Sequence, residues 1–265
     1  MNLLFTVCGR AGSKGVRGKN LRDFCGIPLI CYTLAAIVLY QERYASKDDF
    51  IQTAVSSDSE ELLRLAAGLS KKLFVIHRAP ELAGDQIPKV AVVLDCLNRA
   101  ETALERKFDM VVDLDITSPL RTVENIRQAI MKKGARTETD VVFSVVPSRR
   151  NPYFNMVRKE DGFFVKAIPS SYTVRQQAPL FYDMNASIYV YSPKALREKN
   201  AAAFFNDRAD VIFMKDTGVL DIDSEEDYTL MQVISEHFYR TWDTYGEVRE
   251  YAAKLAAGLS KRMNN

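Results

Sequence analysis

Short apolar runs alternate along the chain with longer stretches in which apolar residues recur every three or four positions. Short runs are typical of buried strands, and the recurring pattern is typical of helices with one apolar face. Leu62, Leu65, Ala66 and Leu69 show that helical spacing after a polar start at Ser57. The pattern predicts strands at residues 3–7, 50–56, 73–76, 110–114 and 141–146, and helices at 28–41, around 62–69, at 90–104 and at 123–131.

This alternation predicts a fold class: a doubly wound, Rossmann-like α/β protein with three α/β/α layers and a mostly parallel sheet. Ligands of such folds bind beyond the carboxyl ends of the strands. The segments that follow the strands are therefore the first place to look for a site. They are residues 8–20, 56–58, 77–78 and 115–121.

The alternation of strand and helix patterns stops after Pro147. Residues 148–192 contain short apolar runs at 153–158, 163–167 and 186–191, with the turn Asp161-Gly162 between the first two. They predict a small antiparallel excursion that serves as a flap or a dimer contact. Sheet character returns at 211–214, and a long helical stretch runs from about 225 to 259. We predict one domain over residues 1–237, including the excursion, and a helical tail over 238–265.

Composition narrows the function classes. The 265 residues carry a net charge of +2, which provides no general attraction to nucleic acid or membrane, so any anion site must be local. Four cysteines form no CxxC pair, and only two histidines occur, which argues against a disulfide framework and against multi-histidine zinc catalysis. The longest near-apolar stretch, 27–40, is too short for a membrane span. We expect a cytoplasmic protein.

The loop after the first strand is the strongest chemical signal. Glycines fall at positions 9, 12, 15 and 18, and no acidic residue lies between Cys8 and Arg22. Glycines let backbone N–H groups approach an anion, and cations neutralise it, so the loop predicts a polyphosphate cradle. It matches neither the Walker A nor the GxGxxG pattern. Its five basic residues are Arg10, Lys14, Arg17, Lys19 and Arg22.

Two acidic pairs, Asp113/Asp115 and Asp221/Asp223, are candidate metal ligands. Alternate residues of an extended segment point to one side, so each pair can present two carboxylates to a hard cation such as Mg²⁺. Acidic residues also commonly close strands, and each pair alone leaves both interpretations open. Asp227 is a metal ligand or a helix-start charge.

Two further segments carry candidate binding groups. Thr117, Ser118 and Arg121 put two hydroxyls and a cation at a strand end, where Thr-Ser-Pro is equally a turn and helix start. Arg175 is of the type that clamps a carboxylate with two hydrogen bonds. From its spacing alone, Arg175 could equally be an exposed surface residue.

Taken in order, these motifs resemble the sugar-acid cytidylyltransferases, which activate acidic nonulosonic sugars as CMP-sugars. The resemblance runs from Leu3 to about Tyr228. It implies Mg²⁺ at Asp221 and Asp223, and catalytic roles for Lys14, Lys19, Asp115, Asp221 and Asp223. The implied nucleotide-binding residues are Arg10, Ala11, Gly12, Ser13, Lys14, Lys19, Asn20, Arg78 and Asp115. The implied sugar-acid residues are Thr117, Ser118, Arg121, Arg175, Gln176, Asn185 and Tyr189.

The resemblance also implies a homodimer and a reaction of CTP with a sugar acid that releases pyrophosphate. Asp115 stands where sialic acid enzymes carry Gln, and Lys89 near a position where they carry Ser. Residues 149–155 and 183–189 look closer to the legionaminic acid branch. Other sugars, namely N-acetylneuraminate, pseudaminate and KDN, stay open as alternatives. A metal-dependent glycosyltransferase would not need the basic loop, and a silent nucleotide sensor would not need the acidic pairs.

Overall fold

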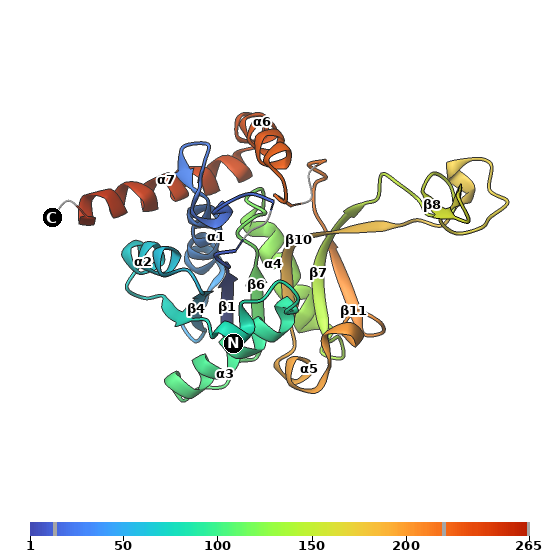
Figure 1. The fold of residues 1–265 in the computed structure, drawn as a ribbon. Helices are drawn as coiled ribbons and strands as arrows, with labels where there is room; N and C mark the ends of the chain where they lie inside the picture. The colour runs from blue at the N-terminus through green and yellow to red at the C-terminus, as the bar shows by residue number, and fades with distance from the viewer. Residues whose placement is uncertain (13–14, 219–220, 264–265) are drawn as a thin grey trace.

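The computed structural model describes residues 1–12, 15–218 and 221–263. Its centre is a seven-stranded sheet in the order β11-β7-β10-β6-β1-β4-β5 (Figure 1). Six strands run parallel, and β10 is antiparallel to its neighbours β6 and β7. The strands are β1 (Asn2–Cys8), β4 (Phe50–Ser57), β5 (Phe74–His77), β6 (Met110–Leu114), β7 (Val141–Pro147), β10 (Tyr182–Tyr191) and β11 (Ala209–Phe213).

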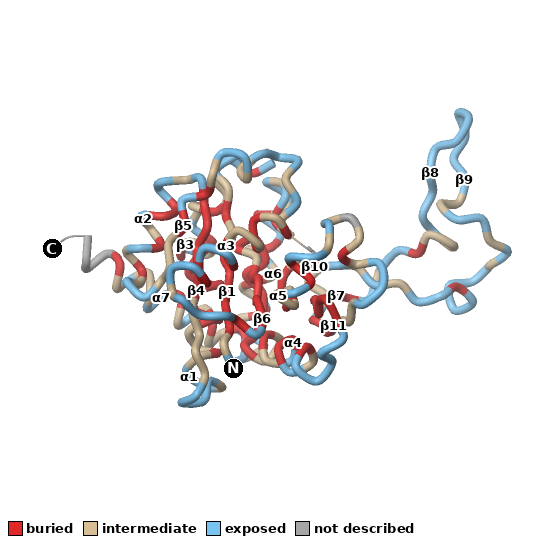
Figure 2. Tube along the Cα trace, turned by 90° about the horizontal axis from the view of Figure 1, so that it is seen from below, coloured by how far each residue is buried: buried red, intermediate tan, exposed pale blue. Residues whose placement is uncertain are grey.

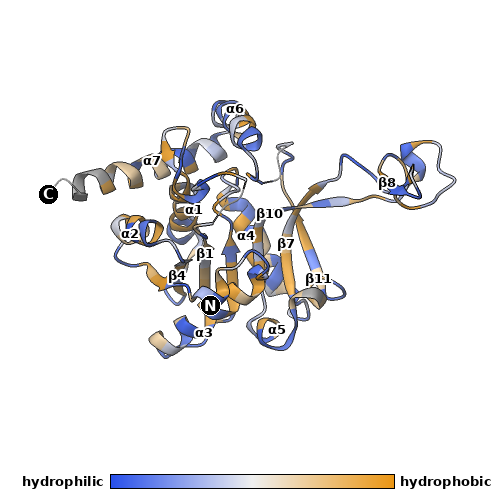
Figure 3. Cartoon of the chain, in the orientation of Figure 1, coloured by the Kyte–Doolittle hydropathy of each residue, from blue (hydrophilic) through white to orange (hydrophobic). Residues whose placement is uncertain are grey.

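Helices cover both faces of this sheet, as the doubly wound class requires. Alternate residues of β1 face opposite layers: Phe5 packs in the core with α1, α2, α4, α6 and α7, and Leu4 packs with α3 and α5. The central strands are therefore buried on both sides. Figure 3 shows mostly hydrophobic residues along β7 and β10. The helices are α1 (Leu29–Tyr44), α2 (Glu60–Leu69), α3 (Lys89–Leu104), α4 (Val123–Ala135), α5 (Pro193–Glu198), α6 (Glu225–Thr241) and α7 (Asp243–Met263).

The predicted excursion leaves the sheet after β7 and returns through β10. It carries the antiparallel hairpin of β8 (Val157–Glu160) and β9 (Phe163–Lys166), and it projects away from the three layers (Figure 2). The predicted turn is present, since Asp161 and Gly162 both have positive φ. Residues 153–155 form turns instead of the predicted strand, and β10 begins at Tyr182, where it pairs with Pro147.

The predicted helical stretch after residue 224 is divided into two helices. Trp242 is extended between α6 and α7, and its ring packs edge-on against Phe238 at 4.7 Å. The expected boundary at residue 237 falls inside α6. Helix α7 packs on α1 and α2, and Val248 and Ala252 belong to the main hydrophobic core. Of the helices in the described ranges, none has the length and apolarity needed to cross a bilayer.

Because α7 is part of the core, a charge on its buried face should destabilise the whole domain. Ala252→Asp places a carboxylate at a fully buried position and should lower the free energy of unfolding by about 3 kcal/mol or more. Ala253→Asp, at the next and exposed position of the same helix, should change it by less than about 0.5 kcal/mol. Urea denaturation measures both. Equal effects of the two substitutions would contradict the packing described for α7.

Candidate active site

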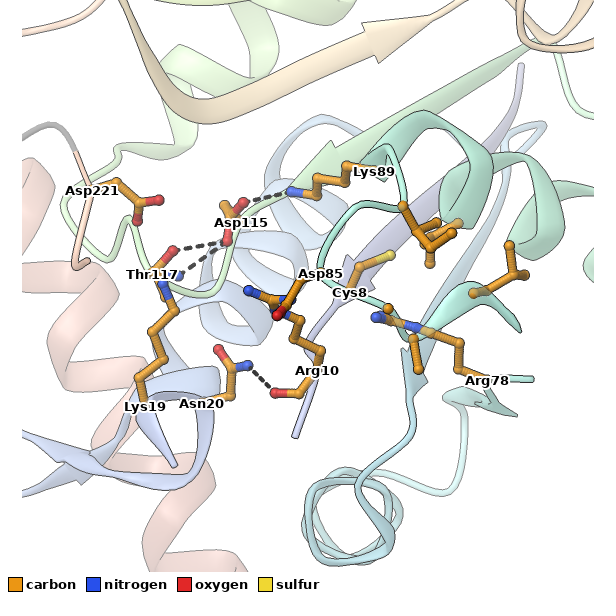
Figure 4. A pocket seen from close by; sticks show the side chains of 15 residues that line it. Cys8, Arg10, Lys19, Asn20, Arg78, Asp85, Lys89, Asp115, Thr117 and Asp221 are labelled. Carbon is orange, nitrogen blue, oxygen red and sulfur yellow. Dashed lines mark hydrogen bonds and ion pairs between the residues drawn. The ribbon is translucent and has the colours of Figure 1, made fainter. Parts of the chain in front are cut away.

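A cavity of about 290 Å³ opens at the carboxyl edge of the sheet. It lies where the sequence predicted ligands to bind, because loops after β1, β5 and β6 form its walls (Figure 4). Residues 82–89, which lead from β5 into α3, form a further wall of the cavity. From the sequence, ligands were expected only at residues 77–78 of this connection. The lining residues are Cys8, Arg10, Lys19, Asn20, Arg78, Leu82, Ala83, Gly84, Asp85, Ile87, Lys89, Val92, Asp115, Thr117 and Asp221.

The glycine-rich loop is anchored to the rest of the molecule by its backbone. The Asn20 side chain donates to the Arg10 carbonyl at 3.0 Å, and the Ala11 N–H donates to the Asp58 carboxylate at 2.9 Å. Gly15 lies so close to the Asp223 carbonyl that a Cβ at this position would be 1.7 Å from its oxygen. A glycine is therefore required there. Gly12 has open space around it, and Ser13 and Lys14 lie outside the described residues.

Two of the loop cations, Arg10 and Lys19, are paired with acidic residues from distant segments. Arg10 forms an ion pair with Asp85. The Lys19 ammonium donates to the Ile222 carbonyl at 2.8 Å and to the Asp223 carboxylate at 3.1 Å. The loop itself contains no counter-charge, and the fold supplies it from more than 70 positions away.

Two more basic side chains have structural partners. Arg22 binds the Glu225 carboxylate through two contacts of 2.6 and 2.7 Å and lies over the Tyr228 ring, so it ties the loop to α6. Arg78 is buried and donates to the Ser56 carbonyl at 2.8 Å, so its guanidinium is fixed at the cavity wall.

Asp113 and Asp115 close β6 and point to the same side, as alternate strand residues should. Both contact the Lys89 ammonium, at 2.7 and 2.6 Å. The second Asp115 oxygen accepts the Thr117 hydroxyl and N–H at 3.0 and 3.3 Å. Burial alone would raise the pKa of Asp115, but Lys89 and Thr117 outweigh it and hold that pKa below the ordinary value.

The second acidic pair does not point to one place. Asp221 lines the cavity, whereas Asp223 has 75% of its side-chain surface exposed and accepts from Lys19. The alternation rule fails here because residues 221–223 are not a strand. Burial and the neighbouring Asp115 charge raise the pKa of Asp221. Asp227 forms a capping box with Ser224 at the start of α6, which matches the helix-start interpretation.

The family model described as Cytidylyltransferase matches residues 5–236. The chain belongs to the cytidylyltransferase family. Helix α7, although part of the core, lies beyond the matched residues.

Similar proteins point in the same direction. A Campylobacter coli protein described as post-translational flagellin modification protein B is 33% identical over 88% of this chain and 94% of its own length. A CMP-N,N'-diacetyllegionaminic acid synthase of Campylobacter jejuni is 32% identical over the same shares. A CMP:2-keto-3-deoxy-manno-octonic acid synthetase solved with CTP has the same fold, with a TM-score of 0.59 at 13% identity, covering 89% of this chain and 99% of that one.

The predicted sugar-acid residues of this cytidylyltransferase lie in three places. Thr117 lines the cavity. Ser118 and Arg121 are buried behind it: Arg121 donates to the Ser118 and Asp115 carbonyls and so shapes the loop after β6. Burial lowers the pKa of Arg121 to about 10. Its role in the structure is to hold Asp115 in place from behind.

The other four predicted sugar-acid residues do not line this cavity. Arg175 and Gln176 belong to the excursion, where Arg175 donates to the Ser148 carbonyl at 2.8 Å. Asn185 is buried and accepts from the Ser144 hydroxyl at 2.6 Å. Tyr189 stacks on Phe143 and Tyr191.

Because the pKa of Asp221 is raised, the ionised carboxylate lowers the free energy of unfolding. The folded chain binds its proton more tightly than the unfolded chain does, so ionisation costs stability once the pH rises above the ordinary value near 3.8. Asp221→Asn should therefore raise the free energy of unfolding at pH 8, and the gain should shrink as the pH falls toward 3.8. Chemical denaturation across this range measures it.

Asp223→Asn is the matched control for this measurement. Asp223 is exposed and its ion pair with Lys19 is at the surface, so its replacement should change stability by less than about 1 kcal/mol. An Asp221→Asn protein that is less stable than the wild type at every pH would contradict the charge repulsion described here.

Proposed function

We propose that this cytidylyltransferase joins CTP to a nonulosonic sugar acid of the legionaminic acid type, giving a CMP-sugar and pyrophosphate. One observation carries the proposal: Arg10 and Lys19 of the glycine-rich loop and Arg78, which follows β5, line the same cavity as Asp115 and Asp221 (Figure 4). The name of the Campylobacter jejuni relative supports the choice of sugar. A glycosyltransferase and a silent nucleotide sensor find no support in the family match.

The chemistry follows from the charges of the two substrates. A hydroxyl of the sugar acid attacks the α-phosphorus of CTP, forms a new P–O bond and loses its proton to water. The P–O bond to the β-phosphate breaks, and pyrophosphate leaves with that electron pair. Both reactants are anions, so their repulsion must be reduced before the reacting atoms meet. Arg10, Lys19 and Arg78 are positioned for that task, and preorganised charge of this kind is usually the largest catalytic term.

We include Mg²⁺ in the proposal because the donor set fits it. Among the described residues, no cluster of three or more His, Cys, Asp or Glu side chains is gathered to hold a metal alone. Asp221 is a cavity-facing carboxylate crowded by a like charge, and Mg²⁺ takes its remaining ligands readily from phosphates and water. When bound, the ion neutralises phosphate charge and acidifies the attacking hydroxyl. Asp221 would hold the ion, and Asp223 would join it only with its ion pair to Lys19 open.

The proposal also includes a homodimer that completes the sugar site. Arg175 is assigned to the sugar carboxylate, yet it sits on an excursion that projects away from the cavity of its own chain. The hairpin of this excursion exposes Phe163 and Phe164, large apolar side chains that a second copy would cover. In such a dimer the excursion of one subunit supplies Arg175 to the other.

The reaction is tested by measuring pyrophosphate release from CTP, Mg²⁺ and a panel of sugar acids: legionaminic, N-acetylneuraminic, pseudaminic, KDN and 2-keto-3-deoxy-manno-octonic acid. The legionaminic acid derivative should have the highest kcat/KM. No release with any member of the panel would overturn the proposed function, and a clear preference for another nonulosonic acid would overturn the choice of sugar.

Lys19→Ala tests the cradle. Loss of one preorganised cation should reduce kcat/KM by roughly 10²-fold. Lys47→Ala, which removes an exposed lysine before β4, should leave it unchanged. Activity of Lys19→Ala within a few fold of the wild type would contradict the assignment of this loop to the phosphates.

Mixed dimers test whether Arg175 acts across subunits. Arg175→Ala and Lys19→Ala homodimers should each be nearly inactive. After the two are mixed and exchanged, about half of the dimers are mixed, and each mixed dimer has one site with both residues intact. Activity should therefore return to roughly a quarter of the wild-type value by this subunit counting. No recovery on proven subunit exchange would contradict the trans arrangement.

A further inference from the structure

Three aspartates and two cations are packed beneath the cavity. Asp113 is fully buried, Asp115 and Asp221 line or approach the cavity, and Lys89 and Arg121 lie among them. The carboxylates outnumber the cations. Such a group is stable only if each charge has close partners, because an unpaired charge in a buried site is costly.

Three of the four oxygens of the β6 pair accept hydrogen bonds from protein groups, and the fourth, on Asp113, has only the ion contact with Lys89. Asp113 accepts from the Thr6 hydroxyl at 2.8 Å and contacts Lys89 at 2.7 Å through its other oxygen. Asp115 accepts from Thr117 with one oxygen and from Lys89 with the other, at 2.6 Å. The Lys89 ammonium therefore occupies the point between the two carboxylates at which a divalent cation would bind.

The position of Lys89 in its helix supports a specific role. It is the first residue of α3, and no acidic residue lies in that turn. A cation at a helix N-terminus is repelled by the helix dipole, so helix formation does not explain a lysine here. The contacts with Asp113 and Asp115 do. Lys89 lines the cavity and its side chain is 32% exposed, so the lysine borders the cavity while Asp113 lies buried behind it.

We propose that Lys89 is a positioning residue that takes the place of a metal ion between Asp113 and Asp115. Lys89 fixes Asp115 at the cavity wall and keeps divalent cations off this pair, which leaves Asp221 as the carboxylate available to Mg²⁺. This assignment deepens the proposed function and rests on it for its catalytic consequence. Its structural consequence, a blocked cation site, is independent of the reaction.

The decisive measurement is Mn²⁺ binding to the full chain without nucleotide, followed by electron paramagnetic resonance of free Mn²⁺. Lys89→Met keeps the length and apolar stem of the side chain but removes the charge. It should bind one more Mn²⁺ per chain than the wild type. Lys89→Met/Asp113→Asn, which breaks the carboxylate pair, should lose that extra ion. Superimposable titrations of Lys89→Met and wild type would overturn the proposal.

Turnover provides a second readout. Lys89→Met should lower kcat by about 10–100-fold, as loss of a partner that orients an active-site group does, while the KM for CTP stays within about threefold. Lys194→Met is the matched control, since Lys194 is exposed near the start of α5 and has no ion-pair partner among the described residues. A loss confined to the KM for CTP would assign Lys89 to nucleotide binding and contradict the positioning role.

Two outcomes separate this inference from its alternatives. If the wild type shows no turnover with any sugar acid, the proposed function fails and the Mn²⁺ titration still decides the role of Lys89. If Lys89→Met alone does not fold, the double variant decides, because it removes an acid together with the lysine and keeps the charge balance. A folded double variant supports the charge role, and an unfolded one shows that Lys89 is needed for packing.

Discussion

Repulsion between like charges is the constraint on which this site depends. Both proposed substrates are anions, and a metal that would screen them needs carboxylates, which add further negative charge. The fold places a cation next to two of the three aspartates that line the cavity: Asp85 contacts Arg10, and Asp115 contacts Lys89. Asp221 is the exception, and its raised pKa records the cost. A site built for a cation carries such a cost until the cation binds.

The same contacts join the two ends of the chain. The loop after β1 meets the segment before α6 at three points: the close approach of Gly15 to the Asp223 carbonyl, the bond from Lys19 to Ile222, and the paired contacts of Arg22 with Glu225. The partners are more than 200 positions apart. The glycine-rich loop is therefore held in its shape by contacts with the segment that leads into α6 and with α6 itself.

Much of the fold followed from the sequence because its signals are local. All five strands that the periodicity predicted up to residue 146 are present, and the cavity lies at the strand ends, where ligands were expected to bind. The alternation rule also put Asp113 and Asp115 on one side of β6. Such inferences need only the backbone geometry of one element and its neighbours.

The remaining features depend on contacts between distant segments. No local pattern shows that Asp85 would meet Arg10, or that Arg121 would turn inward to hold the Asp115 carbonyl. The helical periodicity continues through residues 225–259, so it does not predict the break at Trp242. That break depends on the packing of the Trp242 ring against Phe238.

The two acidic pairs show why a short motif does not define a chemistry. Asp113 and Asp115 lie on a strand, so their carboxylates converge, and the convergence point is taken by an ammonium group. Asp221 and Asp223 lie on an irregular segment, so their carboxylates diverge, and only the first reaches the cavity. Asp113 and Asp115 therefore have the better geometry for a metal, but Lys89 occupies the position between them. Which carboxylate serves a cation depends less on the spacing of the aspartates than on the charge that the fold places opposite them.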